Sequence, residues 1–204
     1  MTKTSQGLGE IRPVTLAGKA VQLEPLQLTH VPLLWDAAKD SIEATFRWIG
    51  YRMQTLEDFR EKAAEVLAEQ DRGLSVPFVT IHRDSGKVVG QTRFMNIDSP
   101  NRRVEIGSTW IAPAWQRTPI NTEAKFLMLR HAFEQWGCLR VELKTDSLNQ
   151  KSRNAILRIG AKEEGTLRQH MVTWDGRRRD SIYFSILDTE WPEVNIRLQK
   201  KLDP

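Results

Sequence analysis

Three parts of the sequence carry side chains suited to proton transfer or anion binding. Glu105 lies within a β-rich apolar run, and a carboxylate in such a place can exchange a proton with a ligand. The polar loop from Trp115 to Thr122 leads into an apolar-faced helix, whose free N–H groups suit an anion such as a phosphate. Asn149 and Ser152 stand three residues apart where a second helix begins, so both side chains share one helix face.

Several other common sites are absent from the sequence. There is no Gly-x-Gly-x-x-Gly or Walker loop and no Gly-x-Ser-x-Gly elbow. The histidines lie far apart without ligand spacing, so we expect no metal site. They are His30, His82, His131 and His170. The single cysteine, Cys138, excludes an internal disulfide, and its place between a glycine and a strand favours a packed thiol over a nucleophile.

The composition is that of an ordinary globular protein. The chain has 204 residues, 40% of them hydrophobic and 27% charged, which suits one domain with a sizeable core. No apolar run approaches the roughly 20 residues of a membrane helix, and the start lacks the apolar core of a signal peptide. We therefore expect a cytoplasmic protein without a membrane partner. The net charge of +4 suits an acidic partner or a polyanionic cofactor.

The elements that must position the three parts follow one another without a linker, repeat or low-complexity tract. The central unit is a strand over 104–111, the polar loop, a helix over 121–136 closed by Gly137, a strand over 139–144 and a short helix capped by Asn149. Before it we predict a hairpin over 14–26, helices over 30–40 and from Thr55 to Gly73, and strands over 76–82 and 88–96. After it we predict strands over 161–173 and 179–187 and a helix over 194–202. We expect residues 1–13 to be a flexible N-terminal segment and residues 14–204 a single domain.

Two further stretches have open interpretations. The aromatic segment Phe46–Tyr51 links two predicted helices and is either a wall of a binding site or core packing, which we favour. The sequence Arg177-Arg178-Arg179 is either a solvated part of a hairpin, which we favour, or a nucleic-acid contact together with Trp174. Because the other basic residues are scattered, we do not expect nucleic acid as a partner.

Residues 102–160 resemble the GNAT superfamily of N-acetyltransferases, in particular the branch of ribosomal-protein N-terminal alanine and serine acetyltransferases. The matching motifs are E-I-G-x-x-W-I-A-P-x-W-Q, T-E-A-K, R-V-E-L-K-T-D and N-x-x-S-x-x-A-I-L-x-x-G-A, in the family's order and spacing. The resemblance implies an α/β fold in a single domain, with a mixed central sheet and flanking helices. It also implies acetyl-CoA as cosubstrate, bound where two parallel strands near 104–111 and 139–146 splay apart.

The resemblance assigns a cofactor role to eight residues, through the backbone of the first strand's end, the pyrophosphate loop and the second helix cap. They are Trp110, Ile111, Gln116, Arg117, Thr118, Asn121, Thr122 and Asn149. The family's loop reads Gln/Arg-x-x-Gly-x-Gly/Ala, with glycines that let the backbone approach phosphate. Here Pro119 and Asn121 replace the small residues, and Pro119 also removes an N–H donor.

For the chemistry, the resemblance makes Glu105 the base that accepts a proton from an attacking amine. The alternative is a structural carboxylate that pairs with Arg102 or Arg103 or holds water. Ser152 becomes the acid for the leaving thiolate, since Ile156 and Leu157 stand where many members carry a tyrosine. The alternative for Ser152 is a hydroxyl at a helix terminus capped by Asn149.

These observations favour an acyl-CoA-dependent N-acyltransferase that moves an acetyl group to a primary amine, on a protein N-terminus or a small molecule. The alternative is a non-catalytic CoA-binding or protein-interaction module on the same fold, with a degraded pyrophosphate loop. The joint presence of Glu105, Asn149 and Ser152 favours the enzyme. Both kinds of acceptor stay as alternatives, and a homodimer is one alternative for the oligomeric state.

Overall fold

The computed structural model describes residues 7–203 and contains one eight-stranded sheet in the order β1-β2-β3-β4-β5-β6-β8-β7. The strands are β1 (Leu16–Ala17), β2 (Val21–Pro25), β3 (Ser75–His82), β4 (Lys87–Asp98), β5 (Arg103–Ile111), β6 (Arg140–Asp146), β7 (Lys162–Val172) and β8 (Arg178–Leu187). Neighbouring strands are antiparallel except β5 and β6, which are parallel. A sheet of this kind with helices on it is the mixed α/β architecture that the sequence predicts, so the fold class is confirmed.

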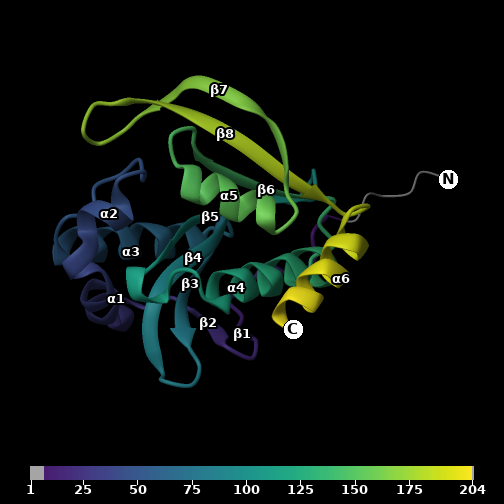
Figure 1. Ribbon diagram of the computed structural model, residues 1–204, viewed down its shortest axis with the longest axis horizontal. Helices are drawn as coiled ribbons and strands as arrows, with labels where there is room; N and C mark the ends of the chain where they lie inside the picture. The colour runs from purple at the N-terminus through teal and green to yellow at the C-terminus, as the bar shows by residue number, and fades with distance from the viewer. Residues whose placement is uncertain (1–6, 204) are drawn as a thin grey trace.

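Helices cover both faces of the sheet (Figure 1). They are α1 (Val31–Ala38), α2 (Ile42–Phe46), α3 (Leu56–Asp71), α4 (Pro119–Arg130), α5 (Gln150–Arg158) and α6 (Trp191–Leu202). One apolar cluster joins α4, α5 and α6 to the sheet, and a second joins α1, α2 and α3 to the opposite face. In the view of Figure 1, β7 and β8 arch over the molecule, and their connected end lies above α2.

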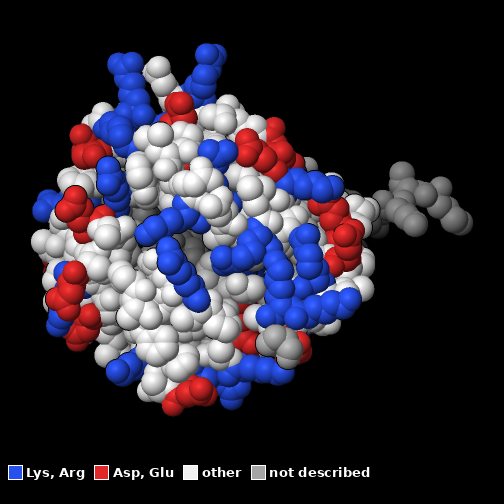
Figure 2. All heavy atoms as spheres, in the orientation of Figure 1, with Lys and Arg blue, Asp and Glu red and all other residues white. Residues whose placement is uncertain are grey.

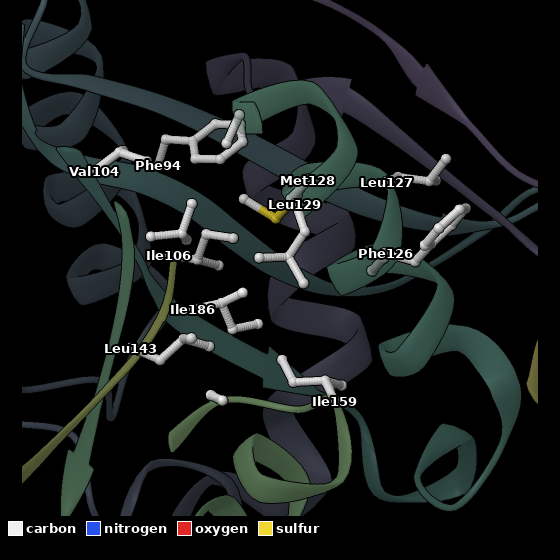
Figure 3. Close-up of a cluster of buried hydrophobic side chains, with 14 of the residues drawn as sticks. Phe94, Val104, Ile106, Phe126, Leu127, Met128, Leu129, Leu143, Ile159 and Ile186 are labelled. Atoms are coloured by element: carbon white, nitrogen blue, oxygen red, sulfur yellow. The ribbon is translucent and has the colours of Figure 1, made fainter. Parts of the chain in front are cut away.

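The helix α4 carries the centre of the core. Thr118 caps its start, because its hydroxyl accepts a hydrogen bond from the N–H of Ile120, and Pro119 takes the first helical position. Figure 3 shows Met128 and Leu129 of α4 directed toward core residues of β5 and β8. Both side chains are fully buried. Burying two such side chains stabilises the fold by roughly 1.5–3 kcal/mol each.

The structure corrects the sequence prediction in details of this unit. The helix predicted over 121–136 begins at Pro119, and its last turn, His131–Gln135, is a π-helix. Gly137 closes it with a φ of 68°, the left-handed conformation that favours glycine. The short helix α2 precedes the aromatic segment and had no counterpart in the prediction. The helix predicted from Thr55 is present as α3, and Thr55 and Asp58 form a capping box at its start.

The division into a flexible segment 1–13 and a domain 14–204 stays a prediction, and residues 1–6 and 204 lie outside the described part. Leu8 and Ile11 pack against the core. Within residues 7–203, no helix has the length and apolar character needed to cross a membrane.

Candidate active site

The parallel strands β5 and β6 separate partway along their length. They are paired only from Arg103 to Glu105 on β5 and from Arg140 to Glu142 on β6. Beyond that point β5 stays paired with β4 as far as Ile111, while β6 stays paired with β8 as far as Asp146. The backbone edges of the two strands that face each other there are therefore free of sheet partners, which creates an opening in the middle of the sheet.

A bulge marks the start of this opening on β5. The pairing with β4 shifts register between Gln91 and Arg93, and Ser108 has a φ of 48°. Thr109 follows, and its hydroxyl lies 2.6 Å from the Nζ atom of Lys125 on α4 and 2.8 Å from the hydroxyl of Thr92. The structure thus ties the bulge to the helix through the side chains of Thr92, Thr109 and Lys125. The sequence assigned none of them a role in the site, although Lys125 ends the T-E-A-K motif.

Lys125 is an uncommon residue in this position. Its side chain is 6% exposed, and burial lowers the pKa of its ammonium group to about 7. Its Nζ atom donates to Thr109 and, at 3.1 Å, to Thr92, and no carboxylate among the described residues forms an ion pair with it. The amino group thus has two hydroxyl acceptors and no carboxylate partner in the described chain, so its burial is not offset by an opposite charge.

Glu105 is a buried carboxylate at the start of the opening. It is 3% exposed and lies on β5 at the last residue that pairs with β6. Its Oε2 atom accepts a hydrogen bond of 2.8 Å from Asn96 Nδ2 and lies 3.4 Å from Lys144 Nζ. Neither donor reaches Oε1, and no other hydrogen bond to that oxygen is present among residues 7–203, so Oε1 remains available as a proton acceptor.

The partners expected under the structural alternative for Glu105 are wrong. Arg102 donates to the carbonyl oxygen of Gly137, and Arg103 pairs with Asp98 and Glu142. Lys144 takes their place because it lies two residues beyond Glu142 on the same face of β6 and reaches Glu105 diagonally. Glu105 also lines a cavity of 780 Å³ whose other walls include Asn96, Leu167 of β7 and Tyr183 of β8.

The loop before α4 is ordered by its own hydrogen bonds. Gln116 Nε2 donates to the carbonyl oxygen of Ile111 at 2.9 Å, and the Thr118 hydroxyl donates to that of Trp115 at 2.7 Å. Arg117 is exposed and has a φ of 62°. The Oδ1 atom of Asn121 is buried and has no hydrogen-bond donor within the described chain.

The other assigned residues divide between backbone and side-chain roles. The side chain of Trp110 lies in the aromatic cluster with Phe46 and Phe59, so only its backbone can border the opening. Thr122 is 9% exposed. On α5, Asn149 accepts a hydrogen bond of 3.1 Å from the N–H of Ser152, which confirms the predicted cap.

Basic side chains surround the side of the opening that faces α4 and α5. The sequence of α5 contains three basic residues and no acidic one, and α6 contributes three more. They are Lys151, Arg153, Arg158, Arg197, Lys200 and Lys201. Figure 2 shows Lys and Arg side chains gathered over these helices, beside a hollow between α4 and α5. This side of the molecule therefore suits a polyanion.

The comparisons with known proteins agree with this geometry. Residues 21–162 match the family model described as the acetyltransferase (GNAT) domain. The chain belongs to this family. A GCN5-related N-acetyltransferase from Brucella melitensis has the same fold, with a TM-score of 0.88 and 33% identity over 97% of this chain and 89% of that chain.

Two further relatives extend the comparison of this GNAT domain. YdaF of Bacillus subtilis (strain 168), named as a candidate ribosomal N-acetyltransferase, is 36% identical over 106 residues. That match covers 52% of this chain and 57% of YdaF, so the chain spans little more than half of that relative's length. RimJ of Mycobacterium smegmatis, solved in complex with CoA-disulfide, shares the fold with a TM-score of 0.81 and 23% identity over 93% of this chain and 95% of that chain.

Proposed function

We propose that this chain is an N-acetyltransferase that moves an acetyl group from acetyl-CoA to a primary amine, with a protein N-terminus as acceptor. The observation that carries the proposal is the separation of β5 from β6 directly beyond the buried Glu105. An acyl donor and an amine held on opposite faces of a sheet can meet only where the sheet is open. The relationship to YdaF supports a protein acceptor, because the name of that protein gives it a ribosomal substrate.

The residues on the α4 and α5 side fit coenzyme A. The unpaired edge of β5 at Trp110 and Ile111 offers backbone groups to the pantetheine arm, and the start of α4 faces the loop that would hold the pyrophosphate. The buried Asn121 Oδ1 atom lacks a donor, and pantetheine carries amide and hydroxyl donors. When bound, acetyl-CoA supplies the acetyl group as a thioester.

Among the loop residues, Gln116 and Thr118 are already engaged in ordering the loop. The exposed guanidinium of Arg117 is therefore the side chain best placed to bind a phosphate, with Thr122 and the cap residue Asn149 nearer the pantetheine arm. Pro119 weakens the loop less than its sequence suggests. At the first helical position its missing N–H is one that the helix itself does not use.

Two side chains carry the proton transfers. Glu105 accepts a proton from the amine through its free Oε1 atom, while Asn96 and Lys144 fix the orientation of the carboxylate through Oε2. Ser152 supplies a proton to the leaving sulfur. Its N–H is bound by Asn149, which fixes the first turn of α5 and with it the hydroxyl.

The proposal is tested by measuring binding and turnover separately. Calorimetry should give a dissociation constant for acetyl-CoA in the micromolar range, about −8 kcal/mol. Release of the CoA thiol should then depend on an added amine, and peptides with a free N-terminus should react faster than small amines. Binding without turnover on any amine would support the non-catalytic alternative. If acetyl-CoA does not bind even at millimolar concentration, both the acetyltransferase proposal and the CoA-binding alternative are excluded.

A further inference from the structure

Two stretches that are about 130 residues apart in the sequence meet on the face of the sheet that carries Glu105. The Nη1 atom of Arg179 donates to the carbonyl oxygen of Trp48 at 3.1 Å, and the N–H of Trp174 donates to that of Gly50 at 3.1 Å. The aromatic segment Phe46–Tyr51 is thus joined to the connected end of β7 and β8, which lies above α2 in Figure 1. This segment therefore borders the site as a wall and also packs in the core.

A buried carboxylate lies at the centre of this junction. Asp146, the last residue of β6, is 1% exposed. Its Oδ2 atom pairs with Arg177 Nη2 at 2.5 Å and lies 3.8 Å from Arg179 Nε. That second distance is too long for a hydrogen bond, and the buried Nε atom of Arg179 has no hydrogen-bond partner in the described chain.

The arginines outnumber the carboxylates here. Arg47 and Arg177 lie 5.0 and 5.5 Å from the ring of Trp48, and Arg179 is 7% exposed beneath it. Arg47 and Asp175 are exposed, so the buried part of the junction consists of Arg177, Arg179 and Asp146. Among the described residues, Asp146 is the one carboxylate that pairs with these two arginines, while Glu105 acts on Arg179 without forming an ion pair with it. Two guanidinium groups that share one paired carboxylate favour binding of a further anion.

The excess charge lies close to the proposed base. Asp146 lies four residues beyond Glu142, the residue of β6 that pairs with Glu105. Burial lowers the pKa of Arg179, while the carboxylates of Asp146 and Glu105 act to raise it. Tyr183, which lines the cavity beside Glu105, also acts on Arg179. Four residues of a strand span about 13 Å, and side chains on both sides shorten that distance, so an acceptor whose amine lies at Glu105 has the arginines within about two or three residues.

We propose that Arg177 and Arg179, held together by Asp146, form a subsite for a carboxylate on the acceptor. The acceptor would be a peptide N-terminus with Asp or Glu at its second or third residue. This inference rests on the proposed function and specifies its substrate. Arg177 makes the direct contact, because its side chain is 30% exposed, while the deeper Arg179 adds charge and holds the Trp48 wall.

The fold provides a matched control in the same hairpin. Arg178 lies between the two arginines but is exposed, and its Nη1 atom donates to Gln169 on β7 instead of approaching Asp146. Arg178→Gln removes the same charge from the same hairpin without touching the proposed subsite. A comparison of Arg177→Gln with Arg178→Gln therefore separates a local contact from a general effect of net charge.

The experiment uses the full chain and C-terminally amidated pentapeptides that begin Ala-Asp, Ala-Asn or Ala-Lys and are otherwise identical and uncharged. A second set places the variable residue third. In the wild type, the aspartate peptide should have a KM at least about tenfold lower than the asparagine peptide in one set, the low end for a charge-assisted hydrogen bond. Arg177→Gln should reduce that ratio to about two or less. Arg178→Gln should leave it unchanged.

Equal KM values for all wild-type peptides, or a preference that survives in Arg177→Gln, would overturn the subsite and leave the acetyltransferase proposal standing. If no peptide is acetylated, the proposed function fails, and the subsite is judged by calorimetric binding of the same peptides to the chain saturated with CoA. Thermal unfolding of each variant shows whether it is folded. If Arg177→Gln does not fold, the wild-type preference for the aspartate peptide is compared at 50 mM and 500 mM salt. A preference that comes from a charge pair must weaken at 500 mM salt, and an unchanged preference would contradict the subsite.

Discussion

The two sides of the opening between β5 and β6 are built in different ways. The side of α4 and α5 is largely continuous in sequence, since one segment of about 60 residues supplies its strands, loop and helix starts, and α6 adds only basic side chains. The opposite side is assembled from pieces distant in sequence, namely Trp48 after α2, Asn96 on β4, Lys144 on β6 and Arg179 on β8. A single segment therefore fixes most of the first side, whereas a change in any one element can alter the second side on its own. That arrangement suits a common cofactor and a variable acceptor.

The largest effect that we expect is on the free energy of unfolding, and it comes from Lys125 on the side of α4 and α5. The pKa of Lys125 is about 7 in the folded chain and 10.5 as its ordinary value. Between these values the unfolded chain binds more protons, so the free energy of unfolding rises with pH from 7 to 10.5. The rise should be on the order of 4 kcal/mol. Urea unfolding of wild type and Lys125→Met across this pH range measures the rise. The free energy of unfolding should increase with pH by this amount more in wild type than in Lys125→Met. Parallel curves would mean that Lys125 stays charged in the fold.

The next effect tests the acceptor side at its centre. Glu105→Gln keeps the shape of the side chain and removes the base, so amine acetylation should fall about 100-fold at neutral pH. The affinity for acetyl-CoA should change little, because Glu105 lies on the other side of the opening. The loss should shrink as pH rises and the amine loses its proton without help. A variant with wild-type rates at every pH would make the carboxylate structural.

The contrast between the two sides also explains what sequence can predict. The strand, loop and helix pattern of residues 102–160 predicted the fold and the cap at Asn149, because each signal is local. The partner of Glu105 was predicted among its own neighbours, and the structure gives Lys144, which depends on the register between β5 and β6. The contact of Arg179 with Trp48 depends on the arch of β7 and β8 over the sheet. Composition alone contains no signal for such pairings.

A third effect concerns the phosphate loop. If the exposed guanidinium of Arg117 binds a phosphate, Arg117→Ala should weaken acetyl-CoA binding by about 1.5–3 kcal/mol and flatten its salt dependence. The measurement is calorimetry with CoA, 3′-dephospho-CoA and pantetheine. Pantetheine has no phosphate, so its affinity should be the same in both proteins. An equal loss for pantetheine would exclude Arg117 as a phosphate ligand.

A smaller effect is expected at the helix cap. Ser152→Ala should lower turnover about tenfold, below the usual range for a proton donor because a thiolate is already a good leaving group. Binding of acetyl-CoA should be nearly unchanged, since Asn149 binds the backbone N–H of residue 152 and not its side chain. Stopped-flow measurement of the acetyl transfer step separates the two quantities. Equal losses in turnover and affinity would assign Ser152 to the pantetheine arm.

The smallest effect should come from the residue that departs most visibly from the family's loop. Pro119 occupies the first position of α4, where proline's fixed φ suits the helix and its missing N–H is not needed. Pro119→Gly adds a donor toward the proposed phosphate site but loosens the loop, and these effects oppose each other. We expect acetyl-CoA affinity to change by less than about 1 kcal/mol, with a loss of stability of about 0.4–1 kcal/mol or somewhat more. Calorimetry and thermal unfolding of Pro119→Gly, with Pro119→Ala as a control that also adds the N–H but keeps more backbone order, measure the two parts. A gain well above tenfold in affinity for both variants would show that proline had suppressed binding. The side of α4 and α5 would then be as specialised as the opposite side, where the acceptor is proposed to bind.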